Sequence, residues 1–465
     1  MTSGRQHVAV IGGGIAGLAA AHALVGSRET EEAPHVVVFE RDHRPGGKLR
    51  TTPFAGHPAI DEGADAFLAR VPWATDLARS VGLGDNMTSP DARSAAVWWD
   101  ALHTIPEGLL LGMPTDLVAL ARSGLLSWPG KLRAATEPFR RRTSVSPDSL
   151  GRFVRARFGS EVHFRLVDPL VGSIYAADTD HFSLAAVPQI ADLAARGRSV
   201  LISGRRMPKP SPTAGPVFST PTEGMGALAG ATAAAVAAAG GRIRTDVSVD
   251  TLEADGSGWR VNDENFDAVI LATPAAGASR LLSREAADAA AMLSAIPTAD
   301  VAIVTVAIDA RDWPARLAGM SGYLVPKPMQ RLVTAVSFGS QKWAHWAIPG
   351  AVVLRISLGR DGLAVLHLPD AELLTAALDE VGKHLGLTVQ PLAVHGQSVR
   401  ISRWSAAFPQ YRPHHAVHIA AAERALPAGL ALAGASYHGI GVPACIRSGQ
   451  QAAAATHTFL HSMAQ

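Results

Sequence analysis

The sequence predicts an α/β fold built around a parallel sheet, and three observations lead to that expectation. A short apolar strand at 7–11 runs directly into a glycine turn, which an Ala/Leu-rich helix follows at 15–25. A second apolar strand at 36–40 completes a βαβ unit. The chain has 465 residues, too many for one compact core, so two or three domains are expected.

Composition narrows the class of protein. Hydrophobic residues make up 48% of the chain, and 42 basic residues nearly balance 40 acidic ones. A net charge of +2 gives no reason to expect nucleic acid as a partner. The single cysteine, Cys445, excludes an internal disulfide and any multi-cysteine metal site, which favours a reducing, cytoplasmic compartment.

The apolar stretch at 8–23 resembles a signal peptide at first sight. Four glycines lie inside it, and no basic run with a small-residue cleavage site accompanies it. No apolar run approaches the ~20 residues that a membrane span needs. We therefore expect no transmembrane segment, although the sequence allows peripheral membrane contact.

The glycine turn predicts a nucleotide site. Residues 12–17 read Gly-Gly-Gly-Ile-Ala-Gly, the G-x-G-x-x-G pattern between a strand and a helix. Gly12 permits a tight turn, Gly14 lets backbone N–H groups approach a pyrophosphate, and Gly17 lets helix and strand pack closely. The helix amino terminus adds partial positive charge. Glu40, at the end of the second strand, is placed to bind ribose hydroxyls and to repel a 2′-phosphate, which disfavours NADP.

Two further glycine segments favour FAD over NAD. The segment 44–49, Arg-Pro-Gly-Gly-Lys-Leu, would let the backbone approach a cofactor beyond its ribose, although an ordinary turn also explains it. A glycine-rich stretch at 433–443 ends with Pro443, which suits a helix start. That helix end would face the flavin ring, a contact for which an NAD-dependent dehydrogenase has no need.

The remaining pattern divides the chain. Helices are expected at 117–126, 148–158 and 226–239, and 106–201 reads as a largely helical insert. The Gly/Pro/Ser-rich stretch 197–216 is expected to be a loop. Strands are expected at 242–249, 266–272, 301–308, 332–338, 352–358 and 430–433, with a final helix to about residue 459.

Several blocks resemble the oxygen-dependent coproporphyrinogen III and protoporphyrinogen oxidases, within the flavin-containing amine oxidase superfamily. The resemblance covers essentially the whole chain, and its most specific blocks are 169–176 (Pro-Leu-Val-Gly-Ser-Ile-Tyr-Ala) and 403–411. The other matching segments are 61–67, 183–184, 321–326, 334–343, 354–360 and 434–446.

The resemblance implies non-covalently bound FAD in a Rossmann-like domain of the flavin amine oxidase type. It assigns 1–90, 218–292 and 425–465 to that discontinuous domain, 91–105 and 293–424 to an α+β, mixed-sheet substrate domain, and 106–217 to a helical domain. The implied FAD contacts are Gly12, Gly13, Gly14, Ile15, Ala16, Gly17, Glu40, Arg41, Gly47, Lys48, Gly63, Ala64, Asp65, Val247, Trp404, Gly434, Ile440, Gly441 and Val442.

The resemblance also implies a reaction. Coproporphyrinogen III would lose six hydrogens in three two-electron steps, with O2 as the final acceptor and H2O2 as a product. The soluble coproporphyrinogen type fits the blocks better than the membrane-bound type. Alternatives are a protoporphyrinogen oxidase, an amine oxidase or carotenoid desaturase, and a flavoprotein without catalytic activity. A downstream chelatase is an implied partner.

No side chain is expected to be an obligate acid or base. The candidates for positioning the substrate are the Ser173 backbone and Tyr175. Ser173 replaces a glycine of the relatives, and 94–98 lacks the arginine that some of them use for a substrate carboxylate. Arg70 is a weak candidate for that role.

Other conspicuous residues have simpler explanations. No metal site is expected, and Cys445 is expected to be a small core residue. The three histidines at 414, 415 and 418 suggest a solvated turn, and 140–142 a solvated basic face rather than a docking patch. The four tryptophans at 98, 99, 343 and 346 fit either a macrocycle pocket or core packing.

Overall fold

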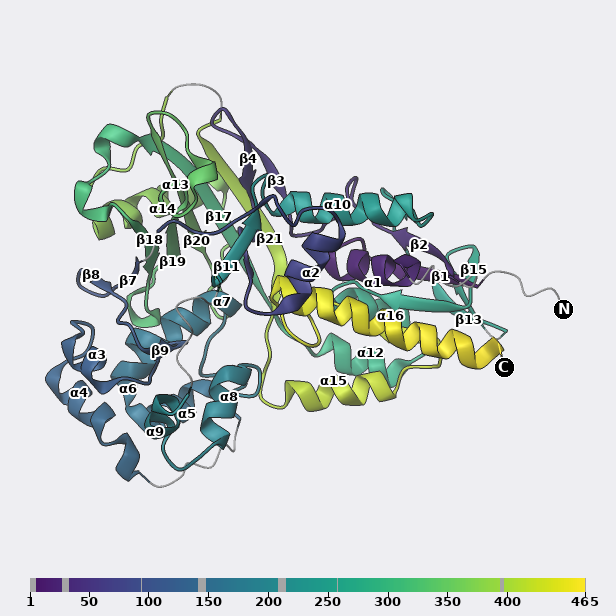
Figure 1. Cartoon of the computed structure of the whole chain (residues 1–465), viewed down its shortest axis with the longest axis horizontal. Coiled ribbons are helices and arrows are strands. Elements are labelled where there is room, and N and C mark those ends of the chain that lie inside the picture. Colours follow the sequence, from purple (N-terminus) through teal and green to yellow (C-terminus); the bar gives the residue numbers. More distant parts are fainter. Residues whose placement is uncertain are drawn as a thin grey trace.

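The computed structural model describes residues 6–26, 33–92, 94–140, 148–207, 215–256, 258–393 and 397–464. Figure 1 shows three regions: a parallel sheet with its helices on the right, a second sheet at the upper left, and a group of short helices at the lower left. No helix among the described residues is long and apolar enough to cross a membrane.

The first region is a five-stranded parallel sheet, which confirms the predicted α/β class. Its strands run in the order β12 (Arg242–Arg244), β2 (His35–Phe39), β1 (His7–Ile11), β16 (Ala268–Leu271) and β22 (Leu430–Leu432). Alternate side chains of β1 enter two separate cores, so both sheet faces are covered and the strands read as continuous apolar runs.

Helices cover both faces of this sheet. One core contains residues from α1 (Ile15–Gly26), α2 (Pro72–Ser80), α10 (Met225–Ala238) and α16 (Val442–Ala464). The other face packs against α11 (Ala275–Leu282), α12 (Ala287–Ser294), α15 (His415–Arg424) and an antiparallel sheet of β13 (Leu252–Asp255), β14 (Gly258–Val261) and β15 (Glu264–Phe266).

The second region is a mixed sheet of seven strands. Their order is β21 (Val399–Pro409), β17 (Thr298–Asp309), β20 (Ala351–Leu358), β19 (Val333–Phe338), β18 (Met320–Leu324), β7 (Ser94–Trp98) and β8 (Leu102–Thr104). The β18–β7 pair is parallel and the other neighbours are antiparallel. One face packs against α14 (Asp370–Leu385), and the opposite face looks toward the third region.

The third region is helical, as predicted. Its elements are α3 (Leu117–Arg122), α4 (Trp128–Ala135), α5 (Leu150–Phe158), α6 (Ser160–Val162), a π-helix at His163–Gly172, α7 (Ser173–Tyr175), α8 (Pro188–Ala195) and α9 (Val200–Arg205). Pro169 lies inside the π-helix, where its missing N–H removes an ordinary helical hydrogen bond. The exact domain boundaries given above stay a prediction.

Smaller elements connect these regions. They are β3 (Thr51–Phe54), β4 (His57–Asp61), β5 (Phe67–Leu68), β6 (Met87–Thr88), β9 (Leu109–Leu110), β10 (Met113–Pro114), β11 (Phe218–Pro221), α13 (Gly339–Lys342) and 3-10 turns at Glu137–Phe139, Ala310–Asp312, Ala315–Leu317, Lys327–Met329 and Ala344–Trp346.

Three local predictions were wrong. The expected loop at 197–216 contains α9. The Ser199 hydroxyl accepts from the Ile202 N–H, and Glu137 accepts from the N–H groups of Val200 and Leu201, so the start of this helix is capped. Residues 208–214 of the expected loop lie outside the described residues. The helix expected to reach residue 126 ends at Arg122, where Ser123 turns extended. The strand expected at 242–249 stops at Arg244.

Candidate cofactor and substrate site

The glycine turn at the β1–α1 junction is both closely packed and open. A Cβ atom on Gly12 would lie 2.7 Å from the Ala272 carbonyl oxygen, and one on Gly17 would lie 2.0 Å from the Gly12 oxygen. At Gly14, by contrast, a Cβ would meet nothing within 4 Å. The turn therefore needs Gly12 and Gly17 for its own packing. Gly14 instead leaves open space beside the amino terminus of α1, which starts with Ile15 and Ala16.

Glu40 lies beside this turn, as predicted. Its carboxylate accepts from the Gly13 N–H at 2.8 Å and from the Asp42 N–H at 2.9 Å. The Val247 N–H donates to the Glu40 carbonyl at 2.9 Å, which brings that residue to the same edge. Arg41 is different, because its side chain is exposed and its ion pair with Asp42 spans 3.9 Å.

The second glycine segment folds against the first. Gly46 donates its N–H to the Gly13 carbonyl at 2.7 Å, and Gly47 adopts a positive φ of 55°. The Arg44 guanidinium donates to the Gly47 carbonyl at 2.9 Å and holds the turn. Lys48 is an exposed residue whose Nζ donates to the Ala407 carbonyl, and desolvation around that Nζ lowers the pKa of the amine.

Residues 61–65 form a strap between the two large sheets. The Gly63 carbonyl accepts from the Arg355 guanidinium, and a Cβ on Gly63 would lie 2.3 Å from the Lys48 oxygen. Asp65 accepts from Lys342 Nζ at 2.8 Å and from Trp343 Nε1 at 3.0 Å. Burial acts to raise the Asp65 pKa, but these donors and Arg355 hold it well below its usual range.

Trp404 and Ala64 complete the strap. Trp404 donates from Nε1 to the Glu62 carbonyl at 3.2 Å, so the indole lies against the strap; its predicted contact with the flavin stays a prediction. Ala64 packs on the core of the parallel sheet.

Asp61 is fully buried, accepts from the Met225 N–H at 2.9 Å, and has a pKa that burial raises to about 6.

The carboxyl-terminal loop returns to the first turn. Gly434 donates to the Ser448 hydroxyl at 2.9 Å, and a Cβ on Gly434 would be 3.9 Å from the Ala16 Cβ. Ile440 and Gly441 lead into α16, which begins at Val442 and packs along α1. Gly449, inside α16, lies against the first turn of α1, since a Cβ there would be 2.1 Å from the Ala16 oxygen.

Tyr411 fixes this loop, a role that sequence reasoning missed. The buried Tyr411 hydroxyl donates to the Ala435 carbonyl and accepts from the Gly439 N–H at 2.9 Å. Its ring stacks on His415 at 4.0 Å between centroids. The only signal in the sequence was its position in the block 403–411.

A cavity of about 90 Å3 lies between the seven-stranded sheet and the helical region. Ser173 lines it, as expected for a positioning residue. Tyr175 is not among its lining residues; its hydroxyl donates to the Ala186 carbonyl at 3.4 Å and its ring contacts Phe182. The lining residues are Asp168, Gly172, Ser173, Ala176, Ala177, Val301, Ile303, Gln330, Thr334, Ser357, Gly359, Arg360 and Phe408.

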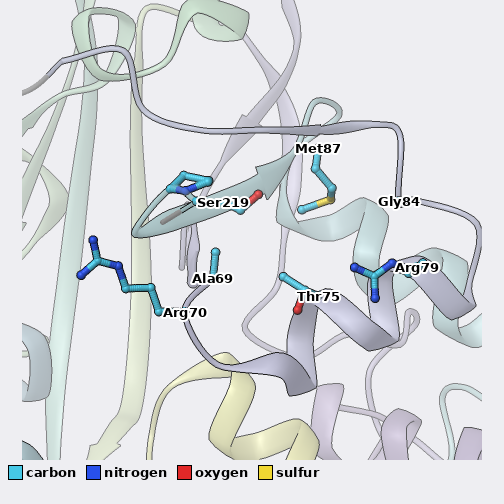
Figure 2. Close-up of a pocket in the computed structure, with 9 residues that line it drawn as sticks. Ala69, Arg70, Thr75, Arg79, Gly84, Met87 and Ser219 are labelled. Carbon is cyan, nitrogen blue, oxygen red and sulfur yellow. The ribbon is translucent and has the colours of Figure 1, made fainter. Parts of the chain in front are cut away.

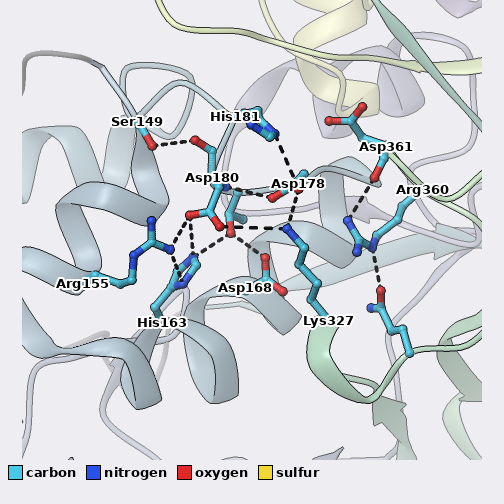
Figure 3. A network of polar contacts seen from close by, with 12 residues as sticks. Ser149, Arg155, His163, Asp168, Asp178, Asp180, His181, Lys327, Arg360 and Asp361 are labelled. Atoms are coloured by element: carbon cyan, nitrogen blue, oxygen red, sulfur yellow. Dashed lines mark hydrogen bonds and ion pairs between the residues drawn. The ribbon is translucent and has the colours of Figure 1, made fainter.

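A polar network supports the acidic side of this cavity (Figure 3). The Thr179 hydroxyl donates to Asp168 Oδ1 at 2.5 Å and lies 2.9 Å from His163 Nε2. Arg155 donates to His163 Nδ1 at 3.1 Å, so Nε2 carries the ring proton and donates to Thr179. Burial lowers the His163 pKa to about 4, in agreement with a neutral ring, and raises the pKa of Asp168.

Arg70 lies at a separate cavity of about 280 Å3 beside α2. Figure 2 shows Arg70 and Arg79 on opposite sides of it, with Thr75, Met87 and Ser219 between them. Arg79 pairs with Asp76 at 2.8 Å. Arg70 does not line the cavity of Ser173 and Asp168, so it belongs to a different site from those residues.

The other conspicuous residues now have places. Cys445 is buried and unbridged, with a pKa that burial raises to about 11. The solvated turn expected around His415 was wrong: that residue is buried and starts α15. Trp343 and Trp346 are fully buried core residues, whereas Trp98 stacks on His384 and Trp99 on Arg165. Arg140 ends the described segment, and 141–142 lie outside it.

The geometry fits a flavin dinucleotide. The open space at Gly14, the carboxylate of Glu40 and the strap at Gly63 follow one another along the edge where the sheet meets the returning loop. Gly441 is similarly open, since a Cβ there would meet only Pro443 at 3.8 Å. An elongated cofactor with a pyrophosphate and a ribose matches this series of groups.

The fold and this site define a flavoenzyme class, and sequence comparison agrees. A family model described as flavin containing amine oxidoreductase matches residues 15–457, so the chain belongs to that family.

Particular relatives are more specific. The chain is 29% identical to the coproporphyrinogen III oxidase of Bacillus subtilis (strain 168), covering 99% of this chain and 100% of that one. It is 33% identical to the coproporphyrinogen III oxidase of Mycobacterium leprae, covering 95% and 96%. A crystal structure from Exiguobacterium sp. 255-15, provisionally named protoporphyrinogen oxidase, superposes with a TM-score of 0.84 at 28% identity, covering 99% and 100%.

Proposed function

We propose that this chain is an FAD-dependent coproporphyrinogen III oxidase that converts coproporphyrinogen III to coproporphyrin III with O2 and releases H2O2. The observation that carries the proposal is the end-to-end similarity to bacterial proteins of that name. The open glycine turn and the returning loop support it, because both suit a non-covalently held flavin.

In this proposal the residues divide the work of binding. Gly12 to Gly17 hold the pyrophosphate, Glu40 the ribose, and Lys48, Gly63 to Asp65 and Trp404 lie along the flavin. FAD supplies a two-electron acceptor for the hydrogens of the substrate. The protein binds and orients the macrocycle beside the cavity between the seven-stranded sheet and the helical region, where Ser173 and the hydrogen-bonded Asp168 lie.

The proposal extends to the setting of the enzyme. It includes a cytoplasmic location with peripheral membrane contact, and transfer of the product to a metal chelatase of haem synthesis. The free-base product has an empty metal-binding centre, which is the substrate that a chelatase requires.

The alternative is a protoporphyrinogen oxidase, which is the name of a 27% identical chloroplast protein from rice and the provisional name of the Exiguobacterium neighbour. Both substrates undergo the same chemistry and differ in the number of carboxylates. Purified holoprotein should be yellow and should make coproporphyrinogen III fluorescent with H2O2 formed in a three-to-one ratio. A larger kcat/KM for protoporphyrinogen IX would favour the alternative, and inactivity on both would refute the proposal.

A further inference from the structure

Among its described lining residues, the cavity between the sheet and the helical region has one cationic side chain. Arg360, at the end of β20, lines it and is half-buried. Its Nε donates to the Gln330 side-chain oxygen at 2.6 Å, and its Nη1 donates to the Asp361 carbonyl at 3.0 Å. Both acceptors are neutral. Within the part of the chain that the structure describes, no carboxylate lies within ion-pair distance of this guanidinium.

Figure 3 shows Asp178 bound to Lys327, and the other neighbouring carboxylates also have partners. Asp361 accepts both of its bonds from Arg412, at 2.6 and 2.9 Å. Asp178 accepts from Lys327 at 2.5 Å. Asp168, on the opposite wall, is held by Thr179. Arg360 is thus the cation among the described lining residues. It acts to lower the pKa of Asp168 and of Asp178, but no hydrogen bond joins its guanidinium to either carboxyl within the described part of the chain.

The shape of the cavity indicates which ligand this guanidinium could bind. At about 90 Å3 it is far too small for a tetrapyrrole, but it suits one short side arm. Val301, Ile303 and Phe408 supply apolar walls, and Arg360 supplies a charged end. A carboxylate at the end of two methylene groups matches both features, because guanidinium and carboxylate form charge-assisted, often bidentate hydrogen bonds.

We propose that Arg360 binds a propionate of the porphyrinogen and is a specificity-determining residue for carboxylate-bearing macrocycles. The proposal rests on the proposed function and deepens it. Gln330 and the Asp361 carbonyl fix the direction of the guanidinium, so its Nη2 is left for the ligand. Arg70, in its separate cavity, does not contribute.

The test compares an acid with its ester. Coproporphyrin III and its tetramethyl ester, presented in the same detergent micelles, are titrated against the holoprotein by fluorescence quenching. In Arg360→Gln the affinity for the acid should fall about ten- to hundredfold, the range expected for one charge-assisted bond, with the ester unchanged. Arg360→Lys keeps the charge without the planar fork and should recover part of the loss.

Kinetics add a second readout. Because the contact is distant from the reacting carbon atoms, Arg360→Gln should raise KM for coproporphyrinogen III more than it lowers kcat. Arg403→Gln is the matched control, since Arg403 lies on β21 but is paired with Asp370 at 2.6 Å outside the cavity. Flavin absorbance per chain should equal that of the unchanged protein in both variants.

Each outcome has a defined meaning. Unchanged affinity for the acid in Arg360→Gln, or an equal loss for acid and ester, would overturn the role of Arg360 while the proposed function stands. Inactivity of the unchanged protein on coproporphyrinogen III would instead refute the proposed function.

Discussion

Two glycines of the first turn are needed for opposite reasons, and substitutions should separate them. Gly14→Val adds side chain to open space, so the apoprotein should keep its unfolding temperature but bind little flavin. Gly17→Ala forces a Cβ to within 2.0 Å of the Gly12 oxygen, so it should lose about 1–3 kcal/mol of stability. Visible absorbance and thermal unfolding of both apoproteins measure the two effects. Equal loss of stability in both variants would contradict this explanation.

Asp61 makes stability depend on pH. Its pKa in the folded protein is about 6, above the value of 3.8 that is ordinary for the exposed side chain. Between about pH 4 and pH 6 the folded chain therefore keeps a proton that the unfolded chain releases. The contribution of Asp61 to the free energy of unfolding falls as pH rises through this window, by at most about 1.4 kcal/mol per pH unit.

The variant Asp61→Asn removes this titration while keeping an oxygen for Thr51 and Met225. Relative to the unchanged protein, its stability should improve steadily from about pH 4 to about pH 6, as urea unfolding would show. Asp76→Asn, at an exposed site on α2, is the matched control. Parallel pH profiles of Asp61→Asn and the unchanged chain would rule out the assigned role.

At the same scale, sequence reasoning succeeded where partners are close along the chain. The glycine turn and Glu40 belong to one βαβ unit, so spacing alone placed them together. Arg355 binds Gly63 across 292 positions, and Gln410 binds the Tyr175 carbonyl across 235, so no local pattern pairs them. The one available signal for Arg355 was a charge inside an apolar strand, Val-Val-Leu-Arg-Ile.

At the scale of elements, a buried ion pair between Glu137 and Arg157 stabilises the packing of the helical region. Glu137 is fully buried, pairs with Arg157, and accepts from Ser199 and from the Val200 N–H at the start of α9. Glu137→Ala leaves a buried guanidinium without its carboxylate and α9 without its cap. We expect a loss of about 3–5 kcal/mol, with faster amide exchange in α9. Asp309→Ala is the control: it breaks an exposed ion pair with Arg311 and should leave amide exchange in α9 unchanged.

Elements with a regular period were predicted well. The strands β1, β19 and β20 match their predicted ranges within one residue, because buried strands show as apolar runs. Helix α9 was missed although Ser199 is a local cap, because the carboxylate that accepts its first N–H groups belongs to Glu137, 62 residues away from Ser199. The π-helix at His163–Gly172 also had no sequence prediction, although Pro169 marks the place where an ordinary helix is interrupted.

At the scale of the molecule, the two large sheets meet at the strap of residues 61–65. Arg355 and Arg400 reach from the seven-stranded sheet to backbone carbonyls of this segment. FAD binding should therefore stabilise the whole chain, by about 2.7 kcal/mol at a hundredfold excess over Kd. In Arg355→Met the rise of unfolding temperature with added FAD should be smaller, whereas Arg403→Met should behave as the unchanged chain.

The buried position of Cys445 makes its reactivity a measure of local opening in the carboxyl-terminal loop. The thiol is the only one in the chain, lies under the loop that Tyr411 fastens, and is 7% exposed. A buried thiol of raised pKa reacts with alkylating reagents only when its cover opens. The rate at which Cys445 is alkylated in the native chain therefore measures how often this loop opens. A ligand bound tightly beside the loop would lower that rate.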